Sequence, residues 1–394
     1  MKLRVAITYN FDDKDWFGGR NYFASLIRSL QLHAAPHIEL VFITGKKTET
    51  SIPNDFPFLE VIRTPMLDRM NPVWLIRQLT LRYFDTDPLL ASFLRQKKID
   101  VLSHSGYLGS NSGIKTIPWL FDFQFVHLPE HWTKRQLQWV KRRYMAACNQ
   151  GDGIIVSSSD ALSDLIAFAP KSRTPKYVLH FVSNPVDFSK ILTKEEICQR
   201  YSLQDNYFYL PNQFWTHKNH IVAIDALALL KKAGVETIIV CTGQTKDLRD
   251  HEYFDKLMVR CHAAGVADNF KVLGVVPFSD AQSLMVHARA VLNPSRFEGW
   301  STTVEEAKTL NKRLILSNIG VHREQSPEFG SFFAPDDAIK LAELMKNVLE
   351  EQLQVITEDE VTLQYAIRQY EFSSSYLKIL DDITKNSKKA GFKQ

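Results

Sequence analysis

The feature that most constrains the fold of this 394-residue chain is a repeated alternation of short apolar runs with longer amphipathic segments. In the first half, residues 4–8 (RVAIT), 39–44 (ELVFIT) and 99–103 (IDVLS) have the composition of buried strands, whereas residues 18–34 place apolar side chains at helical spacing. Strands that alternate with helices are typical of βαβ units around a parallel sheet. The pattern therefore predicts an α/β fold.

The same pattern starts again in the second half, with strand-like runs at 207–213, 237–243, 270–276, 290–295 and 313–318. Because the chain is too long for one hydrophobic core, we predict two α/β units. Their predicted bounds are 1–187 and 188–370, and 371–394 is expected to form a C-terminal helix that crosses back to the first unit and frays at its end. Two facing parallel sheets would align their strand carboxyl ends along a shared cleft, where ligands usually bind.

Composition excludes several classes of protein. With 45% hydrophobic and 23% charged residues, the chain has neither the charge excess of a disordered segment nor the cysteine density of a disulfide scaffold. The residues from Met1 onward have the pattern of a strand rather than of a signal peptide, so we expect neither export by that route nor a membrane-spanning helix, and a net charge of +4 favours no particular partner. The cysteines lack metal-ligand spacing, so we interpret them as reduced thiols of a cytoplasmic protein: Cys148, Cys198, Cys241 and Cys261.

Two loops have residues that suit an anion. Gly18 and Gly19 follow the first strand and precede a helix, where backbone N–H groups can approach a phosphate, although paired glycines serve equally as a turn. Lys218 stands between a strand and a helix that begins near His220. There it is either a charge for phosphate oxygens or an ordinary solvated lysine, and spacing alone does not separate the two interpretations.

The stretch NPSRFEGWSTTVEEA, residues 293–307, contains three glutamates around a turn between a strand and a helix. Thr302 and Glu305 have the spacing of a capping box, which gives Glu305 a structural role. Glu306 lies about 100° further round the helix, and Glu298 precedes the helix in the loop. Both are therefore free for ligand binding, with the backbone N–H groups of 299–303 between them.

The stretch that begins at Pro294 and Ser295 resembles a Pro-Ser-x-x-Glu-Gly-aromatic segment with a Glu-x7-Glu motif, which marks the retaining glycosyltransferases of family 4. That family has the GT-B fold, two facing Rossmann-like domains with an interdomain cleft. The resemblance implies that Glu298 binds hydroxyls of a donor sugar and that Glu306 binds the ribose of its nucleotide. It also implies that the diphosphate is held by the turn of Gly299, Trp300, Ser301 and Thr302.

The resemblance covers nearly the whole chain and is strongest in its second half. Residues 270–295 look like the segment that leads to the motif, which would place the backbone of Leu273 to Val275 near the base. Residues 313–325 look like the strand and turn that follow it, with Glu324 where the family often has a glutamate. Residues 182–190 are similar to an interdomain Asn-Gly-Val-Asp segment.

In the first half, residues 122–132 are similar to an Asp-x-Gln-x-x-His-x-Pro-Glu segment of polysaccharide glycosyltransferases. By that resemblance, Asp122 and His127 are candidates for acceptor positioning or sugar contact. A lone histidine is otherwise more often structural than catalytic.

One position departs from the family pattern. Members commonly have an arginine that faces the diphosphate, and here Gln213 takes its place ahead of Lys218. A neutral amide can donate hydrogen bonds but brings no charge. We hypothesise that Arg296, or His217 if protonated, supplies part of the missing positive potential.

The implied activity is transfer of a sugar, with retention of configuration, from a nucleoside diphosphate to a glycan or lipid-linked glycan in polysaccharide biosynthesis. Uridine diphosphate glucose is favoured by family frequency alone. Lys218 and helix amino termini would act where charge develops on the leaving phosphate, and we favour front-face attack because the segment offers no obvious covalent nucleophile. We expect no cofactor and no metal, although Asp-x-Asp triplets occur at 13–15 and 85–87.

Alternative functions are a nucleotide-sugar epimerase of the same fold and a non-catalytic nucleotide-sugar binding protein. Nucleic-acid binding lacks a recognition motif. Peripheral contact with the inner face of a membrane is suggested by 132–147, where Trp132 and Trp139 alternate with basic residues. The simpler interpretation, which we favour, is a surface helix that packs Leu137, Val140 and Tyr144 inward.

Overall fold

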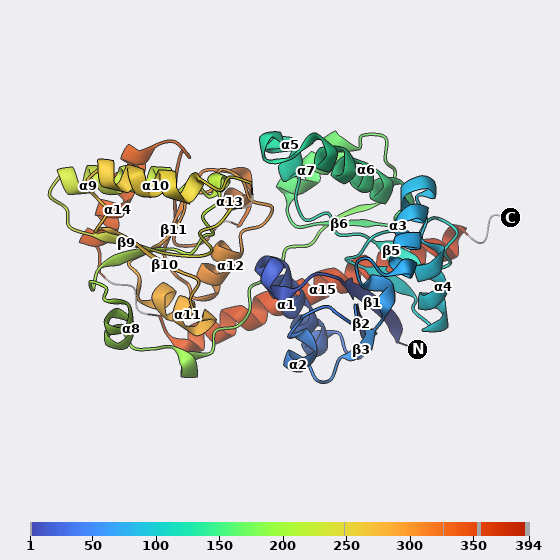
Figure 1. Ribbon diagram of the computed structural model, residues 1–394. Helices are drawn as coiled ribbons and strands as arrows, with labels where there is room; N and C mark the ends of the chain where they lie inside the picture. Colours follow the sequence, from blue (N-terminus) through green and yellow to red (C-terminus); the bar gives the residue numbers. More distant parts are fainter. Residues whose placement is uncertain (1, 248, 326, 353–355, 391–394) are drawn as a thin grey trace. The chain divides into compact units, whose positions relative to one another are not determined.

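Two parallel sheets organise the chain (Figure 1), and the computed structural model describes residues 2–247, 249–325, 327–352 and 356–390. The chain divides into a first unit, Met1–Val182 with Ile367–Gln394, and a second unit, Ser183–Ala366. The last helix, α15 (Glu358–Ala390), begins in the second unit and continues in the first.

The first unit is built on a five-stranded parallel sheet in the order β3-β2-β1-β4-β5, with a separate parallel pair β6-β7. A bridge between Trp119 and Ile155 connects the two. The strands are β1 (Leu3–Tyr9), β2 (Ile38–Thr44), β3 (Glu60–Arg63), β4 (Val101–Ser103), β5 (Lys115–Ile117), β6 (Ile154–Val156) and β7 (Lys176–Val178). The helices are α1 (Phe17–His33), α2 (Ile52–Asp55), α3 (Pro72–Phe84), α4 (Pro88–Gln96), α5 (Gln124–His127), α6 (Lys134–Gln150) and α7 (Ser159–Phe168).

The second unit has a six-stranded parallel sheet in the order β10-β9-β8-β11-β12-β13. Its strands are β8 (Tyr207–Leu210), β9 (Ile238–Thr242), β10 (Phe270–Gly274), β11 (Val291–Asn293), β12 (Leu314–Ser317) and β13 (Gly330–Phe333). Its helices are α8 (Lys194–Tyr201), α9 (His220–Lys232), α10 (Tyr253–Ala263), α11 (Phe278–His287), α12 (Thr302–Thr309), α13 (Gly320–Gln325) and α14 (Ala338–Glu350).

Alternate residues of β8 enter different cores, as the two-residue period of a strand requires. Phe208 and Leu210 pack with α9, α10 and α14, whereas Tyr207 and Tyr209 pack with α8, α11 and α12. Figure 1 shows these two sets of helices on opposite faces of the sheet. A parallel sheet covered on both faces explains why its strands are apolar throughout. The predicted α/β fold with two Rossmann-like units is confirmed.

Smaller expectations have definite outcomes. All four cysteines are free and buried, as expected of core thiols. Helix α6 begins with a capping box of Thr133 and Gln136 and packs Val140 into a core with Leu137 and Tyr144 beside it, so these three residues face inward as predicted. Within the described ranges, no helix is long and apolar enough to cross a membrane.

Candidate functional site

The second unit brings together two residues that are far apart in the sequence. Lys218 ends a short 3-10 turn after β8, and Glu298 lies in the loop between β11 and α12. The Lys218 Nζ lies 2.7 Å from Oε1 of Glu298, and the side chains are only 14% and 10% exposed. Strands β8 and β11 are neighbours at the point where the strand order reverses, which is where ligands bind in open α/β sheets.

The charge of Glu298 is set by competing effects. Burial raises the pKa of its carboxyl, but the charges of Lys218 and His322 and hydrogen bonds from Lys218 and Ser295 outweigh burial, so the pKa lies below its usual value. Glu298 is therefore a carboxylate near neutral pH, held against an ammonium. The pair can accept hydrogen bonds from sugar hydroxyls at one end and offer positive charge at the other.

The loops that carry the pair are fixed by amides at the strand ends. Asn219, in a left-handed conformation with φ of 58°, donates from Nδ2 to the carbonyls of Pro294 (3.1 Å) and Pro335 (2.8 Å). Asn212 donates to Oδ1 of Asn293 at 3.0 Å, which also accepts from the hydroxyl of Ser295 at 2.7 Å. Sequence reasoning assigned none of these asparagines, although asparagine at strand ends and in left-handed turns is a recognisable signal.

Helix α12 begins differently from the prediction. The residue that caps it is Ser301, whose Oγ accepts from the backbone N–H of Val304, so the predicted capping box of Thr302 with Glu305 is wrong. Helical geometry begins one residue earlier than the prediction assumed, so Glu305 is the fourth residue of the helix rather than the third and does not have the position of a capping-box partner. The Glu305 side chain is instead buried and accepts from Nε2 of Gln325 at 2.9 Å.

The structural role of Glu305 does not affect the other residues of the turn. Trp300 is 9% exposed, and the side chain of Gln325 holds the backbone of Ser301 by accepting from its N–H and donating to its carbonyl. Thr302 and Thr303 are the first residues of α12, and the first backbone N–H groups of a helix have no acceptor within it. This helix amino terminus follows Glu298 directly and is suited to an anion.

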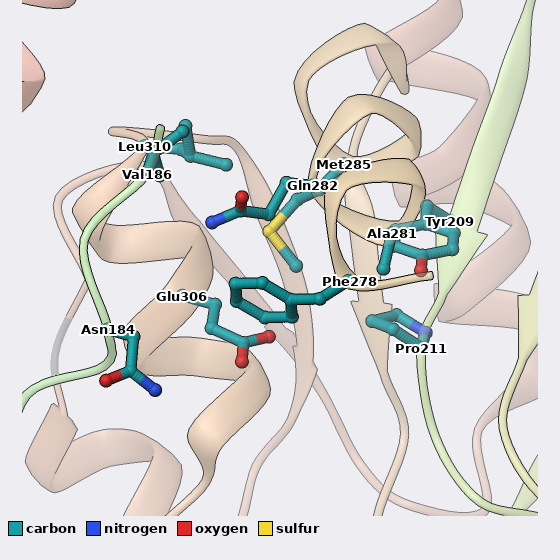
Figure 2. Close-up of a pocket in the computed structure, with 10 residues that line it drawn as sticks. All are labelled: Asn184, Val186, Tyr209, Pro211, Phe278, Ala281, Gln282, Met285, Glu306 and Leu310. Atoms are coloured by element: carbon teal, nitrogen blue, oxygen red, sulfur yellow. The ribbon is translucent and has the colours of Figure 1, made fainter. Parts of the chain in front are cut away.

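Glu306 lies in a pocket that Figure 2 shows in close-up. Its carboxylate lies beside the ring of Phe278, which is 48% exposed. Burial disfavours the charged form and raises the pKa of Glu306 to about 7. The remaining lining residues come from the 184–186 segment, β8, α11 and α12: Asn184, Val186, Tyr209, Pro211, Ala281, Gln282, Met285 and Leu310.

Leu273 and Val275 flank a bulge at the end of β10. Gly274 adopts φ of 70°, where the register with β9 shifts, and its carbonyl accepts from the N–H of Gly243 at 2.8 Å. Leu273 packs against the core, while the side chain of Val275 is 69% exposed. The bulge presents the 274–276 backbone at the carboxyl end of the sheet.

Gln213 and its suspected substitute Arg296 have different surroundings. Within the described residues, the buried Oε1 of Gln213 accepts no hydrogen bond. Arg296 forms an ion pair with Asp336 and its side chain is 42% exposed. His217 is buried, and its carbonyl accepts from the backbone N–H of Arg296 at 2.8 Å, so both of the suspected residues belong to the same loop junction.

The structure adds one cation that sequence reasoning missed. Arg249 lies over the ring of Trp215 at 4.8 Å and pairs with Asp247 at 3.0 Å. The N–H of Phe214, which follows Gln213, donates to the carbonyl of Gln244, so the segment after β9 lies beside the Gln213 loop. No motif in the sequence predicts that these two loops are neighbours.

In the first unit, the predicted residues have local partners. Gly19 lies within the first turn of α1, where an added Cβ would lie 2.3 Å from the Trp16 ring, so Trp16 packing is a sufficient reason for this glycine. His127 Nε2 is 2.8 Å from Oδ2 of Asp164 and is half-exposed. Asp122 accepts from the N–H of Gln124 at 3.1 Å.

The Asp-x-Asp triplets have structural surroundings. Asp87 pairs with Arg77 at 2.8 Å and caps α4, and Asp85 ends α3 in a left-handed conformation. Asp13 accepts from the hydroxyl of Tyr9 at 2.6 Å and from the N–H of Ser51 at 2.8 Å. In the part of the chain that the structure describes, no three acidic, histidine or cysteine side chains cluster as a metal site would require.

Comparison with known proteins gives the class. Residues 194–369 match the family model of glycosyl transferases group 1. The O-antigen chain mannosyltransferase RfbU of Salmonella typhimurium is 28% identical over 170 residues, which cover 42% of this chain and 43% of that protein. The chain thus aligns with less than half the length of this curated relative. Both findings support the glycosyltransferase superfamily.

Solved structures extend the likeness to the whole chain at the level of fold. A glycosyltransferase from Rickettsia africae superposes with a TM-score of 0.67 at 14% identity, covering 98% of this chain and 99% of that one. HepE of Anabaena, in complex with UDP, gives 0.66 at 14%, covering 98% and 100%. WaaG, a glycosyltransferase involved in lipopolysaccharide biosynthesis, gives 0.59 at 16%, covering 94% and 95%. The fold is therefore GT-B.

Proposed function

We propose that this protein transfers a sugar from a nucleoside diphosphate to a glycan or lipid-linked glycan acceptor in polysaccharide biosynthesis. The observation that carries the proposal is the buried Lys218–Glu298 pair at the strand-order reversal of the second unit, beside the amino terminus of α12. The family match over 194–369 includes all of these elements. The names of RfbU and WaaG, in O-antigen and lipopolysaccharide synthesis, support a polysaccharide product.

The chemistry follows from where charge develops. As the bond between the sugar carbon and the diphosphate oxygen breaks, negative charge grows on the leaving phosphate, and the Lys218 ammonium and the first N–H groups of α12 would stabilise it. Glu298 would hold sugar hydroxyls. The acceptor hydroxyl attacks on the same face, its proton passes to the leaving phosphate, and configuration is retained. In this scheme the protein supplies the positive charge without a metal.

The donor nucleotide would occupy the pocket at Glu306. Its carboxylate would accept from ribose hydroxyls, and the backbone at 273–275 would lie near the base. We favour a uridine diphosphate sugar, and UDP-glucose in particular, and the solved complexes of HepE with UDP and with UDP-glucose support this choice. The name of RfbU points instead to mannose, so the two likenesses favour different sugars.

The test is a binding and turnover screen on the full chain. Calorimetry with UDP, GDP and ADP sugars should give one family of donors that binds, and adding glycan acceptors should release the nucleoside diphosphate. An altered sugar on an intact nucleotide would indicate epimerisation instead, and binding without any turnover would indicate a sensor. If no nucleotide sugar binds, the proposal is wrong.

A further inference from the structure

Helix α3 buries a charged residue and exposes apolar residues, which is the reverse of an ordinary surface helix. Its buried residue is Arg77, 6% exposed, which donates from Nε and Nη2 to the carboxylate of Asp87. Its outer side holds an apolar stripe, defined as Leu75, Ile76, Leu79 and Tyr83, whose exposed fractions are 41%, 50%, 53% and 66%. At 100° per residue the four fall within an arc of about 100°. The helix is therefore joined to its own unit partly through an ion pair, while aliphatic side chains face outward.

Three further apolar side chains near the stripe are exposed. Met70 before α3, Phe84 at its end and Leu89 at the start of α4 are 75%, 72% and 36% exposed. Single exposed apolar residues are common on soluble proteins, but several on one side of a helix usually mark a surface that meets a partner. Burial inside this unit does not explain why these positions are apolar, whereas contact with a partner would.

The surroundings of the stripe are basic and aromatic. Arg69 and Arg82 are exposed on α3 or directly before it. Arg142 of α6 reaches Asp85, the last-turn cap of α3, at 3.5 Å, and one turn earlier on α6 Trp139 is 59% exposed. Arginines beside exposed aliphatic and tryptophan side chains are the composition of an element that lies in the interface of an anionic bilayer.

We propose that the apolar stripe of α3, with Trp139 and Arg142 of α6, docks this protein on a bilayer that contains anionic lipids. The aliphatic side chains would enter the acyl boundary, while Arg82 and Arg142 would meet lipid phosphates. A second copy of the chain fits less well, because a two-fold contact through the stripe would bring its arginines towards each other. The sequence pattern at 132–147 pointed to α6 alone, but Trp132 packs beside Phe125 in the first unit, and the larger exposed surface is on α3.

A protein docked in this way would meet a lipid-linked acceptor at the bilayer surface. The test of docking, however, does not depend on turnover. Full-length protein is sedimented with vesicles of phosphatidylglycerol and phosphatidylethanolamine, and separately with phosphatidylcholine vesicles. The combined substitutions Ile76→Ser, Leu79→Ser and Tyr83→Ser should lower partition into the anionic vesicles by at least about tenfold. The matched control replaces Val259 and Ile339, 68% and 74% exposed in the second unit, with serine and should change partition by less than about twofold.

A charge-reversal variant tests the electrostatic contribution to vesicle binding by itself. Arg82→Glu with Arg142→Glu should weaken binding to anionic vesicles about tenfold or more, and raised salt should do the same to the unaltered protein, with little change on phosphatidylcholine. Circular dichroism and thermal unfolding establish that each variant is folded.

Three results would overturn the membrane proposal: the unaltered protein stays in solution with anionic vesicles at low salt, the serine variant sediments as the unaltered protein does, or sedimentation velocity shows that the stripe joins two copies. Turnover with a water-soluble glycan is measured on the same samples. If the unaltered protein shows turnover but does not bind vesicles, the docking surface alone is wrong, whereas if it binds vesicles without turnover, the proposed function alone is wrong.

Discussion

Two buried ion pairs, one in each unit, show how similar chemistry serves different ends. Arg77 and Asp87 in the first unit are 7% and 2% exposed, and Asp87 accepts from Nε and Nη2 of Arg77 and from the N–H of Leu90. In the second unit, Lys218 donates to Glu298 alone among the described residues. The first pair has its hydrogen bonds filled by the protein, as a structural pair requires, and the second retains capacity for a ligand.

The largest expected effect is on stability and tests the first pair. Arg77→Ala leaves the Asp87 carboxylate buried without its cation, and we expect a loss of about 3–5 kcal/mol in the free energy of unfolding. Chemical denaturation measures it. The double variant Arg77→Met with Asp87→Leu should recover much of the loss because no buried charge is left alone, and donor affinity should stay unchanged in both. If either variant folds but loses donor affinity, the structural role of this pair is contradicted.

The second pair should show the opposite signature. Lys218→Ala and Glu298→Gln should each lower turnover by about 10²–10³-fold, since groups that stabilise developing charge or hold the sugar contribute on that scale. Release of nucleoside diphosphate measures turnover, and thermal unfolding measures folding. The matched control is the exposed pair Lys256 and Glu252, 3.1 Å apart in the same unit, whose replacement by alanine and glutamine should leave turnover unchanged. Equal losses in the control would remove the special role of the buried pair.

Glu306 provides a pH-dependent test within the same unit. Its pKa is raised to about 7 by burial, so between the ordinary value of 4.5 and pH 7 the folded protein holds a proton that the unfolded chain releases. The stability contribution of this group is therefore complete below pH 4.5 and is lost as pH rises through 7. Thermal unfolding from pH 4.5 to 8 should show a decline that Glu306→Gln reduces.

Donor binding should depend on pH in the reverse direction. If ribose hydroxyls donate to the ionised carboxylate of Glu306, affinity should rise by up to about tenfold per pH unit below 7 and then level off. Calorimetry of the donor identified in the screen, compared with Glu306→Gln, measures the slope. A parallel pH profile in the variant would mean that Glu306 does not contact the donor.

The smallest effect is expected at Arg296. Because its guanidinium is half-exposed and already pairs with Asp336, Arg296→Ala should weaken donor binding by about threefold or less. Gln213→Arg should strengthen it by more, since that change returns a cation to the position that the family pattern favours. Unchanged affinity and turnover in Arg296→Ala would end the hypothesis that this residue replaces the family arginine.

The sequence determined the fold class, because the alternation of apolar runs with amphipathic segments reflects the burial of both faces of each parallel sheet. It also singled out Lys218 and Glu298, because each lies in a loop between a predicted strand and a predicted helix, where ligands bind in α/β folds. These features are local or periodic, and so they can be recognised from the sequence alone.

The tertiary structure decided what depends on neighbours far away in the chain. It placed Glu298 against Lys218, showed that Ser301 rather than Thr302 caps α12, and gave Glu305 a partner in Gln325. It also revealed that α3 buries its arginine and exposes its apolar stripe, since helical spacing alone defines a face but not its direction. Which face of a helix meets the protein is fixed by long-range packing, and that information is absent from the pattern of a single segment.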